Sequence, residues 1–231
     1  MNCIEKRSTR KFNLGAGLIE KFGMRYEPEE GIVEAKQQLT DALLVMKMSQ
    51  KDGVATQIFP FLFIGSIGCA YNAEELNKNN ITHIVCATSK AKEKFPQSIK
   101  YHRINIEDTL QEDITPVLMP FIKFVDSVRL SNENNRILVH CFQGRSRASS
   151  LCVAYMIYCT LRGQNGRRQV NQDEMSNLFC SSLDVIRARR PLVCPNSSFR
   201  RQVIAFFLED KNYTKNDGLL FSDGDSDSVD T

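Results

Sequence analysis

Residues 136–158 restrict the possible fold more than any other part of this sequence. Residues 136–139 read Arg-Ile-Leu-Val, a short apolar run with β-branched side chains that predicts a buried strand. Residues 148–158 are largely apolar over a length that predicts a packed helix. The loop between them reads His140-Cys141-Phe142-Gln143-Gly144-Arg145-Ser146-Arg147. A strand, a compact loop and a helix in this order point the loop N–H groups and the helix N-terminus at one spot, which favours the binding of a phosphate dianion.

The side chains of this loop suit chemistry on a phosphate. Cys141 supplies a sulfur that is nucleophilic as the thiolate, and loop amides, a helix N-terminus and nearby arginines lower the pKa of such a cysteine to about 3.5–7.5. Arg147 offers a planar fork of donors for two phosphate oxygens. His140 is expected to orient the loop and to tune the cysteine. The phosphate-binding residues are predicted to be Phe142, Gln143, Gly144, Arg145, Ser146 and Arg147.

A structural explanation of the loop is a buried cysteine that follows a strand and precedes a basic surface patch. The matched offsets of His140, Cys141, Gly144 and Arg147 favour the catalytic interpretation. The loop resembles the HCxxGxxR signature of cysteine-dependent phosphatases, and its flanks resemble the dual-specificity protein phosphatases. Residues 57–66 and 81–85 are similar to core strands of that family, and residues 190–199 to its RPxxxPNxxF segment. The resemblance covers about residues 54–209 and is strongest to the small plant-type MAP kinase phosphatases, which share HCF-x-G-x-SR and a helix before the core.

One position departs from the family pattern. Most members carry Ser or Thr after the arginine, and its hydroxyl stabilises the cysteine thiolate as it leaves the phosphorus. This chain has Ala148, and Ser149 is expected to point elsewhere on a helix. The departure therefore concerns the second chemical step, in which the cysteinyl-phosphate is hydrolysed, rather than the first step, in which it forms.

A second loop is expected to supply a general acid, because the leaving oxygen of a phosphoester needs a proton. Residues 107–109 read Glu-Asp-Thr and follow a predicted strand, so they lie at the same sheet edge as Cys141. The family resemblance implies that Asp108 is the acid. Asp113 and Glu107 are the rival candidates, and a turn residue or an Asx cap is the structural alternative for Asp108.

The order of elements predicts an α/β fold with a mainly parallel central sheet flanked by helices. Its ligand site is expected at the carboxyl ends of the strands. We divide the chain into an N-terminal extension (1–52), a catalytic domain (53–210) and an acidic tail without ordered structure (211–231). Strands are predicted near 57–64, 81–87, 101–106 and 136–140, helices near 72–79, 116–131, 147–161, 173–189 and 196–209, and a polar loop at 162–172.

The composition of the 231 residues, 42% hydrophobic and 25% charged, is typical of a globular domain. A net charge of +3 gives no argument for a nucleic-acid partner. No segment approaches 18 uninterrupted apolar residues, so no membrane span is expected, and the polar N-terminus does not resemble a signal peptide. We expect an intracellular protein, cytoplasmic or nuclear. Its eight cysteines show no metal-binding spacing, so neither a metal nor a cofactor is expected.

Two N-terminal segments suggest protein partners. Residues 6–14 place Lys6, Arg7, Arg10 and Lys11 before Phe12 and Leu14, which resembles the docking motif by which MAP kinases hold their phosphatases. A solvated basic tail and a nuclear import signal fit this composition too. Residues 29–48 have the periodicity of an amphipathic helix, which either packs on the catalytic domain or binds a partner in the manner of a calmodulin target.

Several functions share this loop chemistry. Hydrolysis of phosphotyrosine and phosphoserine or phosphothreonine in proteins is the main interpretation, because the flanks match the dual-specificity enzymes. A phosphoinositide phosphatase would need more cations than Arg145 in the loop, and an RNA 5′-phosphatase would need a basic and aromatic stripe. A slow-turnover phospho-binding module is the remaining alternative, and Ala148 is the feature that favours it.

Overall fold

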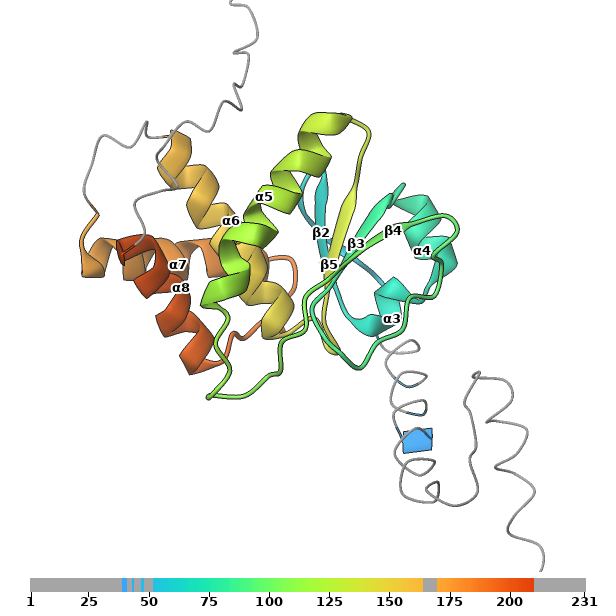
Figure 1. Cartoon of the computed structure of the whole chain (residues 1–231), viewed down its shortest axis with the longest axis horizontal. Coiled ribbons are helices and arrows are strands. Elements are labelled where there is room, and N and C mark those ends of the chain that lie inside the picture. The colour runs from blue at the N-terminus through green and yellow to red at the C-terminus, as the bar shows by residue number, and fades with distance from the viewer. Residues whose placement is uncertain (1–38, 41–42, 44–46, 48–51, 164–169, 210–231) are drawn as a thin grey trace, which may run out of the picture.

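The computed structural model describes residues 39–40, 43, 47, 52–163 and 170–209 (Figure 1). Its continuous parts contain five strands and six helices, one strand and one helix more than the sequence predicts. The strands are β1 (Thr56–Phe59), β2 (Leu62–Gly65), β3 (His83–Cys86), β4 (Lys100–Arg103) and β5 (Ile137–His140). The helices are α3 (Ile67–Ala70), α4 (Ala73–Lys78), α5 (Thr115–Ser131), α6 (Arg147–Gly163), α7 (Gln172–Arg187) and α8 (Ser197–Glu209).

The strands form one sheet in the order β1-β2-β5-β3-β4. The pairs β2–β5, β5–β3 and β3–β4 are parallel, and β1 joins the edge antiparallel to β2. This arrangement confirms the predicted α/β fold with a mainly parallel sheet. β5 lies in the centre and every residue from Ile137 to His140 is buried, which explains why the three residues before His140 are all apolar.

Helices cover both faces of the sheet (Figure 1). α5, α6, α7 and α8 lie on one side, where their apolar side chains pack against Leu62, Ile64 and Val139. α3 and α4 lie on the other side, where a smaller core holds Phe63, Ile84 and Leu138 among its members. The alternation of neighbouring strand residues between the two cores is the period-two pattern of a pleated strand.

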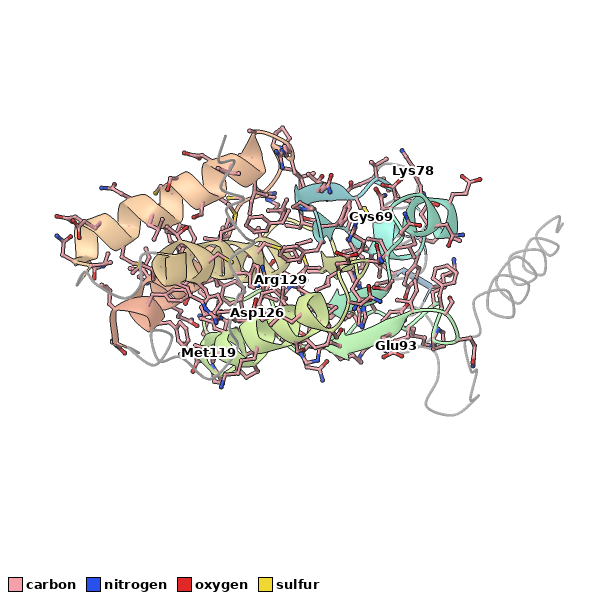
Figure 2. All side chains as sticks on the ribbon, turned by 90° about the horizontal axis from the view of Figure 1, so that it is seen from above. Cys69, Lys78, Glu93, Met119, Asp126 and Arg129 are labelled. Atoms are coloured by element: carbon pink, nitrogen blue, oxygen red, sulfur yellow. The ribbon has the colours of Figure 1, made fainter. Side chains whose placement is uncertain are left out.

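The helices are fixed by caps and by a buried polar cluster. Asn171 and Glu174 form a capping box at the start of α7. Asp126 of α5 is buried, accepts a hydrogen bond from the Tyr155 hydroxyl of α6 (2.7 Å) and lies 3.4 Å from Arg162 Nη1 (Figure 2). Burial, with the Asp126 charge, raises the pKa of Tyr155, so this hydroxyl keeps its proton and remains a donor.

Three predicted segments had wrong boundaries, and one helix was missed. Residues 57–64 are two strands of a tight hairpin, because Pro60 and Phe61 form a turn between β1 and β2. β4 ends at Arg103 rather than at 106, since the chain leaves the strand at Ile104 to form the loop that carries Asp108. α3 was not predicted. α6 extends through Arg162 and Gly163, which were assigned to the polar loop; the remainder of that loop, 164–169, lies outside the described residues.

The predictions for the two ends of the chain fall largely outside the described residues. This holds for the basic segment 6–14, for most of the segment 29–48 and for the acidic tail 211–231. Leu39, Thr40, Leu43 and Lys47 are described and helical, and 47% of Leu43 is exposed. Among the described residues, no helix has the length and apolarity to span a bilayer, and no cluster of three or more His, Cys, Asp or Glu side chains is arranged to hold a metal.

Candidate active site

Surrounding parts of the protein hold the loop between β5 and α6 through hydrogen bonds to the carbonyl groups of the loop. The carbonyl of Phe142 accepts a hydrogen bond from the N–H of Ile67 (3.1 Å). Those of Gln143 and Gly144 accept from Arg190 (3.2 Å each). That of Arg145 accepts from the N–H of Cys194 (2.8 Å). Four successive carbonyls are thus bound to the surrounding scaffold.

The N–H groups of the same loop are left available. Within the described part of the chain, no N–H group of residues 142–146 donates a hydrogen bond to protein. Buried or half-buried amides without a partner are costly unless a ligand or water satisfies them. A loop with bound carbonyls and unbound amides next to a helix N-terminus is built to surround an anion.

Gly144 is required by the shape of this loop. Its φ is +62°, in the left-handed region that favours glycine. A Cβ atom at this position would lie 2.4 Å from the carbonyl oxygen of Gly65 and 2.7 Å from Nη2 of Arg190. The loop is therefore packed against the end of β2 and against the Arg190 side chain with no room for a methyl group.

Cys141 and Arg147 lie at the two ends of the loop, as the sequence predicts. The Cys141 side chain is buried, and within the described residues its Sγ accepts and donates no hydrogen bond. The Arg147 side chain is 9% exposed, and its Nη1 donates to the carbonyl of Ile106 (3.2 Å). Its Nε is buried and has no hydrogen-bond partner in the described part of the protein. A buried guanidinium N–H with no hydrogen-bond partner among the described residues, beside loop amides that are likewise unbound there, fits the oxygens of a phosphate group.

His140 supports the loop at its first residue. The ring is buried, and its Nδ1 lies 3.1 Å from the carbonyl oxygen of Cys141. Burial lowers the pKa of His140 to about 4, so the ring is neutral near pH 7. A neutral ring satisfies this contact as the tautomer that carries its proton on Nδ1 and donates it to the carbonyl. Its contact is thus with the backbone of Cys141.

Asp108 comes to the loop from the opposite segment and is fixed there by three side chains. Its Oδ1 accepts hydrogen bonds from Ser146 Oγ (2.7 Å) and from Asn196 Nδ2 (3.0 Å). Its Oδ2 lies 3.9 Å from Nε of Arg147. The side chain remains 36% exposed, so it is open to a ligand bound in the loop.

The two rival acids have other contacts. Asp113 Oδ1 accepts a hydrogen bond from the N–H of Thr115 (2.9 Å), the first residue of α5. Glu107 accepts from the Ser89 hydroxyl (2.9 Å). Of the three candidates, Asp108 has the contact to Arg147, so the geometry favours it as the proton donor.

The hydroxyl groups near Ala148 are engaged elsewhere. Ser149 Oγ donates to the carbonyl oxygens of Arg145 (2.6 Å) and Ser146 (2.8 Å), which turns this hydroxyl to the helix backbone. Ser146 Oγ donates to Asp108 and accepts from the N–H of Asn196 (3.1 Å). Ala148 itself is fully buried. Neither serine replaces the missing hydroxyl next to Cys141.

Sequence reasoning missed the supporting roles of Arg190, Asn196 and Asp52. Arg190 and Asn196 belong to the 190–199 segment that carries the family resemblance, but nothing in that segment indicates which loop they contact. Asp52 pairs with Arg190 across 138 positions of the chain, and a partner at such a distance has no local signal.

This geometry defines the class of cysteine-dependent phosphatases, and comparison with known families narrows it. The family model described as “Dual specificity phosphatase, catalytic domain” matches residues 62–209, more than half of the sequence. The chain therefore belongs to the dual specificity phosphatase family.

Individual relatives agree with this assignment. The chain is 31% identical over 151 residues to dual specificity protein phosphatase 15 of Mus musculus, covering 65% of this chain and 57% of that protein. It is 28% identical over 154 residues to dual specificity protein phosphatase 1 of Homo sapiens, covering 67% of this chain and 37% of that protein. The crystal structure of DUSP15 superposes with a TM-score of 0.56 at 29% identity and covers 67% of this chain and 87% of that one. The chain thus spans little more than half, or less, of the length of these full-length relatives.

Proposed function

We propose that this protein is a protein phosphatase that hydrolyses phosphotyrosine and phosphoserine or phosphothreonine through a cysteinyl-phosphate intermediate. The observation that carries the proposal is the loop itself. Its carbonyls accept hydrogen bonds from the surrounding protein, and Cys141 lies at its base. Among the described residues, its amides and the buried Nε of Arg147 have no hydrogen-bond partner. The family membership supports the same reaction.

In the first step the phosphate group binds to the loop amides and to Arg147. The thiolate of Cys141 attacks phosphorus, the S–P bond forms and the bond from phosphorus to the substrate oxygen breaks. The leaving oxygen takes a proton from Asp108. Because Oδ1 of Asp108 already accepts from Ser146 and Asn196, Oδ2 is the oxygen placed to carry that proton. Arg147 and the amides stabilise the charge on the phosphoryl oxygens in the transition state.

In the second step a water molecule attacks the phosphocysteine. Asp108, now a carboxylate, accepts a proton from this water, the S–P bond breaks and inorganic phosphate leaves. The departing thiolate of Cys141 is stabilised by the loop amides but by no hydroxyl at position 148. We therefore expect the second step to be slow relative to the first.

A phosphorylated MAP kinase is the substrate that we propose within this class. The support is the basic and apolar pattern of residues 6–14 and the resemblance to MAP kinase phosphatases; relatives that match include dual specificity protein phosphatases 1 and 4 of Homo sapiens. A calmodulin-like partner for residues 29–48 is a second, independent proposal. Neither segment belongs to the continuously described part of the structure.

The activity is tested with wild type and Cys141→Ser on phosphotyrosyl and phosphothreonyl peptides, a soluble phosphoinositide and a 5′-phosphorylated RNA, all in EDTA. We expect turnover of the peptides by the wild type and none by Cys141→Ser. Turnover that survives this substitution, or that requires a divalent metal, contradicts the mechanism. Faster turnover of the phosphoinositide or the RNA contradicts the substrate class but not the mechanism.

The docking proposal needs a separate measurement. Replacing Lys6, Arg7, Arg10 and Lys11 with Ala is expected to raise KM for an activated MAP kinase and to leave KM for an aryl phosphate unchanged. The wild-type KM for the kinase is also expected to rise with salt, because screening weakens the basic contacts. An equal KM for the kinase in the wild type and the variant would show that residues 6–14 are not the docking site.

A further inference from the structure

The Arg190 side chain supports the catalytic loop from behind. Its Nε donates to the carbonyl of Gly144 and its Nη2 to the carbonyl of Gln143, both at 3.2 Å. The residue is 4% exposed, and the absent Cβ of Gly144 would lie 2.7 Å from Nη2. Arg190 thus touches two of the peptide groups whose N–H groups face the proposed phosphate.

Asp52 determines how this guanidinium is oriented. Its Oδ1 accepts from Nη1 of Arg190 (3.1 Å), and its Oδ2 accepts from Nη2. This two-point contact fixes the plane of the guanidinium, which is the property that distinguishes such a pair from a simple contact of charges. The Asp52 side chain is 17% exposed, so the pair is largely removed from water. A buried guanidinium needs this partner, because an unpaired charge in such a place is unfavourable.

Asp52 is itself attached to the elements around the loop. Its carbonyl oxygen accepts from the Ser66 hydroxyl (2.7 Å) and lies 3.3 Å from the thiol of Cys69 in α3. Ser66 caps α3, and the next residue, Ile67, donates to the carbonyl of Phe142. Asp52 therefore joins the two supports of the loop, α3 on one side and Arg190 on the other.

We propose that Asp52 is a positioning residue of the catalytic loop and that it acts through Arg190. This inference rests on the proposed phosphatase function and extends it beyond the family domain, because Asp52 precedes residue 62, where the family match begins. The Asp52–Arg190 pair connects the catalytic loop to the end of the N-terminal extension. The catalytic unit of this chain thus includes a residue that the family comparison leaves out.

The physical consequence concerns the alignment of amides. Without the carboxylate, Arg190 keeps its charge but loses the contacts that fix its plane. The carbonyls of Gln143 and Gly144 then lose fixed donors, and their peptide groups lose the orientation that points the N–H groups of Gly144 and Arg145 at the phosphoryl oxygens. The amides face the most negative charge on the phosphoryl oxygens in the transition state, so misaligned amides weaken transition-state binding most. We therefore expect kcat to fall more than KM rises.

The test uses the full chain and the variants Asp52→Asn, Arg190→Gln and both together. Glu75→Gln is the matched control, because Glu75 is a buried carboxylate that accepts hydrogen bonds from the N–H of Ala55 and from Asn79 without touching the catalytic loop. Kinetics on an aryl phosphate and the Ki of vanadate, a mimic of the transition state, are measured at a temperature at which thermal melts show every variant folded.

We expect Asp52→Asn to lower kcat about tenfold or more and to raise the vanadate Ki by a similar factor, as a displaced catalytic group does. Glu75→Gln is expected to lower the melting temperature alone. In the Arg190→Gln background, Asp52→Asn is expected to have no further effect on kcat. Unchanged kcat and Ki in Asp52→Asn overturn the proposal, as does a full effect in the absence of Arg190. If the wild type has no Cys141-dependent turnover, the proposed function fails, and the positioning role of Asp52 is then tested by direct vanadate binding. Weaker binding of vanadate to Asp52→Asn than to the wild type upholds the role. Equal binding to both proteins, or no binding to the wild type, overturns it.

Discussion

Replacing Gly144 with Ala is the smallest change that tests the shape of the catalytic loop. The residue has a φ of +62°, and an alanine in the left-handed region costs about 1–2 kcal/mol. The new methyl group would also lie 2.4 Å from the carbonyl oxygen and 2.5 Å from the carbonyl carbon of Gly65, both of which are backbone atoms. Overpacking of this kind costs about 1–3 kcal/mol. Together the two effects predict a loss of roughly 2–5 kcal/mol of folding free energy.

The assay compares thermal melts and kcat/KM for an aryl phosphate. A loss of that size lowers the melting temperature by about 4–20 °C for a domain of this length, and a shift of the loop lowers kcat/KM by about 10²-fold. Gly163→Ala is the control, because the position is in α6 and, apart from its chain neighbours and the backbone of its own helix, no described atom lies within 4 Å of the added Cβ. This variant is expected to be as stable as the wild type or more so. A Gly144→Ala protein with wild-type melting temperature and activity would refute the account of the loop.

Three further predictions concern individual groups in the site. Asp108→Asn should lower kcat by about 10²–10⁴-fold, measured on a series of aryl phosphates, with the smallest loss for leaving groups that need no proton; an equal loss across the series would make the residue structural. Ala148→Ser should raise kcat and abolish a pre-steady-state burst of leaving group, because the thiolate gains a hydroxyl donor; a burst-free wild type with no gain in the variant would contradict this. The pKa of His140 is lowered from 6.5 to about 4 in the folded protein. As the pH falls between these values, His140 binds a proton in the unfolded chain but stays neutral in the folded protein. Folding free energy should therefore decrease by up to about 3 kcal/mol from pH 7 to pH 4, measured by urea titration, and the same slope in His140→Asn would count against this origin.

The parts of this structure that follow from local pattern were predictable. The apolar run of β5, the long apolar α6 and the spacing of Cys141 and Arg147 are encoded within one stretch of sequence. The position of Asp108 followed from topology, because the carboxyl ends of the parallel strands β4 and β5 lie at the same sheet edge, although β3 lies between them.

The errors and omissions share a different physical origin. The apolar run around Pro60 reads as one strand by periodicity, although a proline that cannot donate a ladder hydrogen bond is the signal for the turn found there. The pairing of Asp52 with Arg190 and the contact of Asn196 with Asp108 join segments 138 and 88 positions apart. Such contacts depend on packing of the whole domain. No pattern within either segment specifies them.

In the proposed mechanism, Cys141 carries the phosphoryl group between the two steps. The most direct measurement is rapid acid quench of the wild type during turnover of a phosphopeptide, followed by mass spectrometry of the peptide that contains Cys141. We expect a phosphocysteine at Cys141 that reaches a large fraction of the enzyme, because Ala148 offers no hydroxyl to assist the second step. We expect no such label in Cys141→Ser. Release of phosphate at the wild-type rate with no label on Cys141 at any quench time would contradict it.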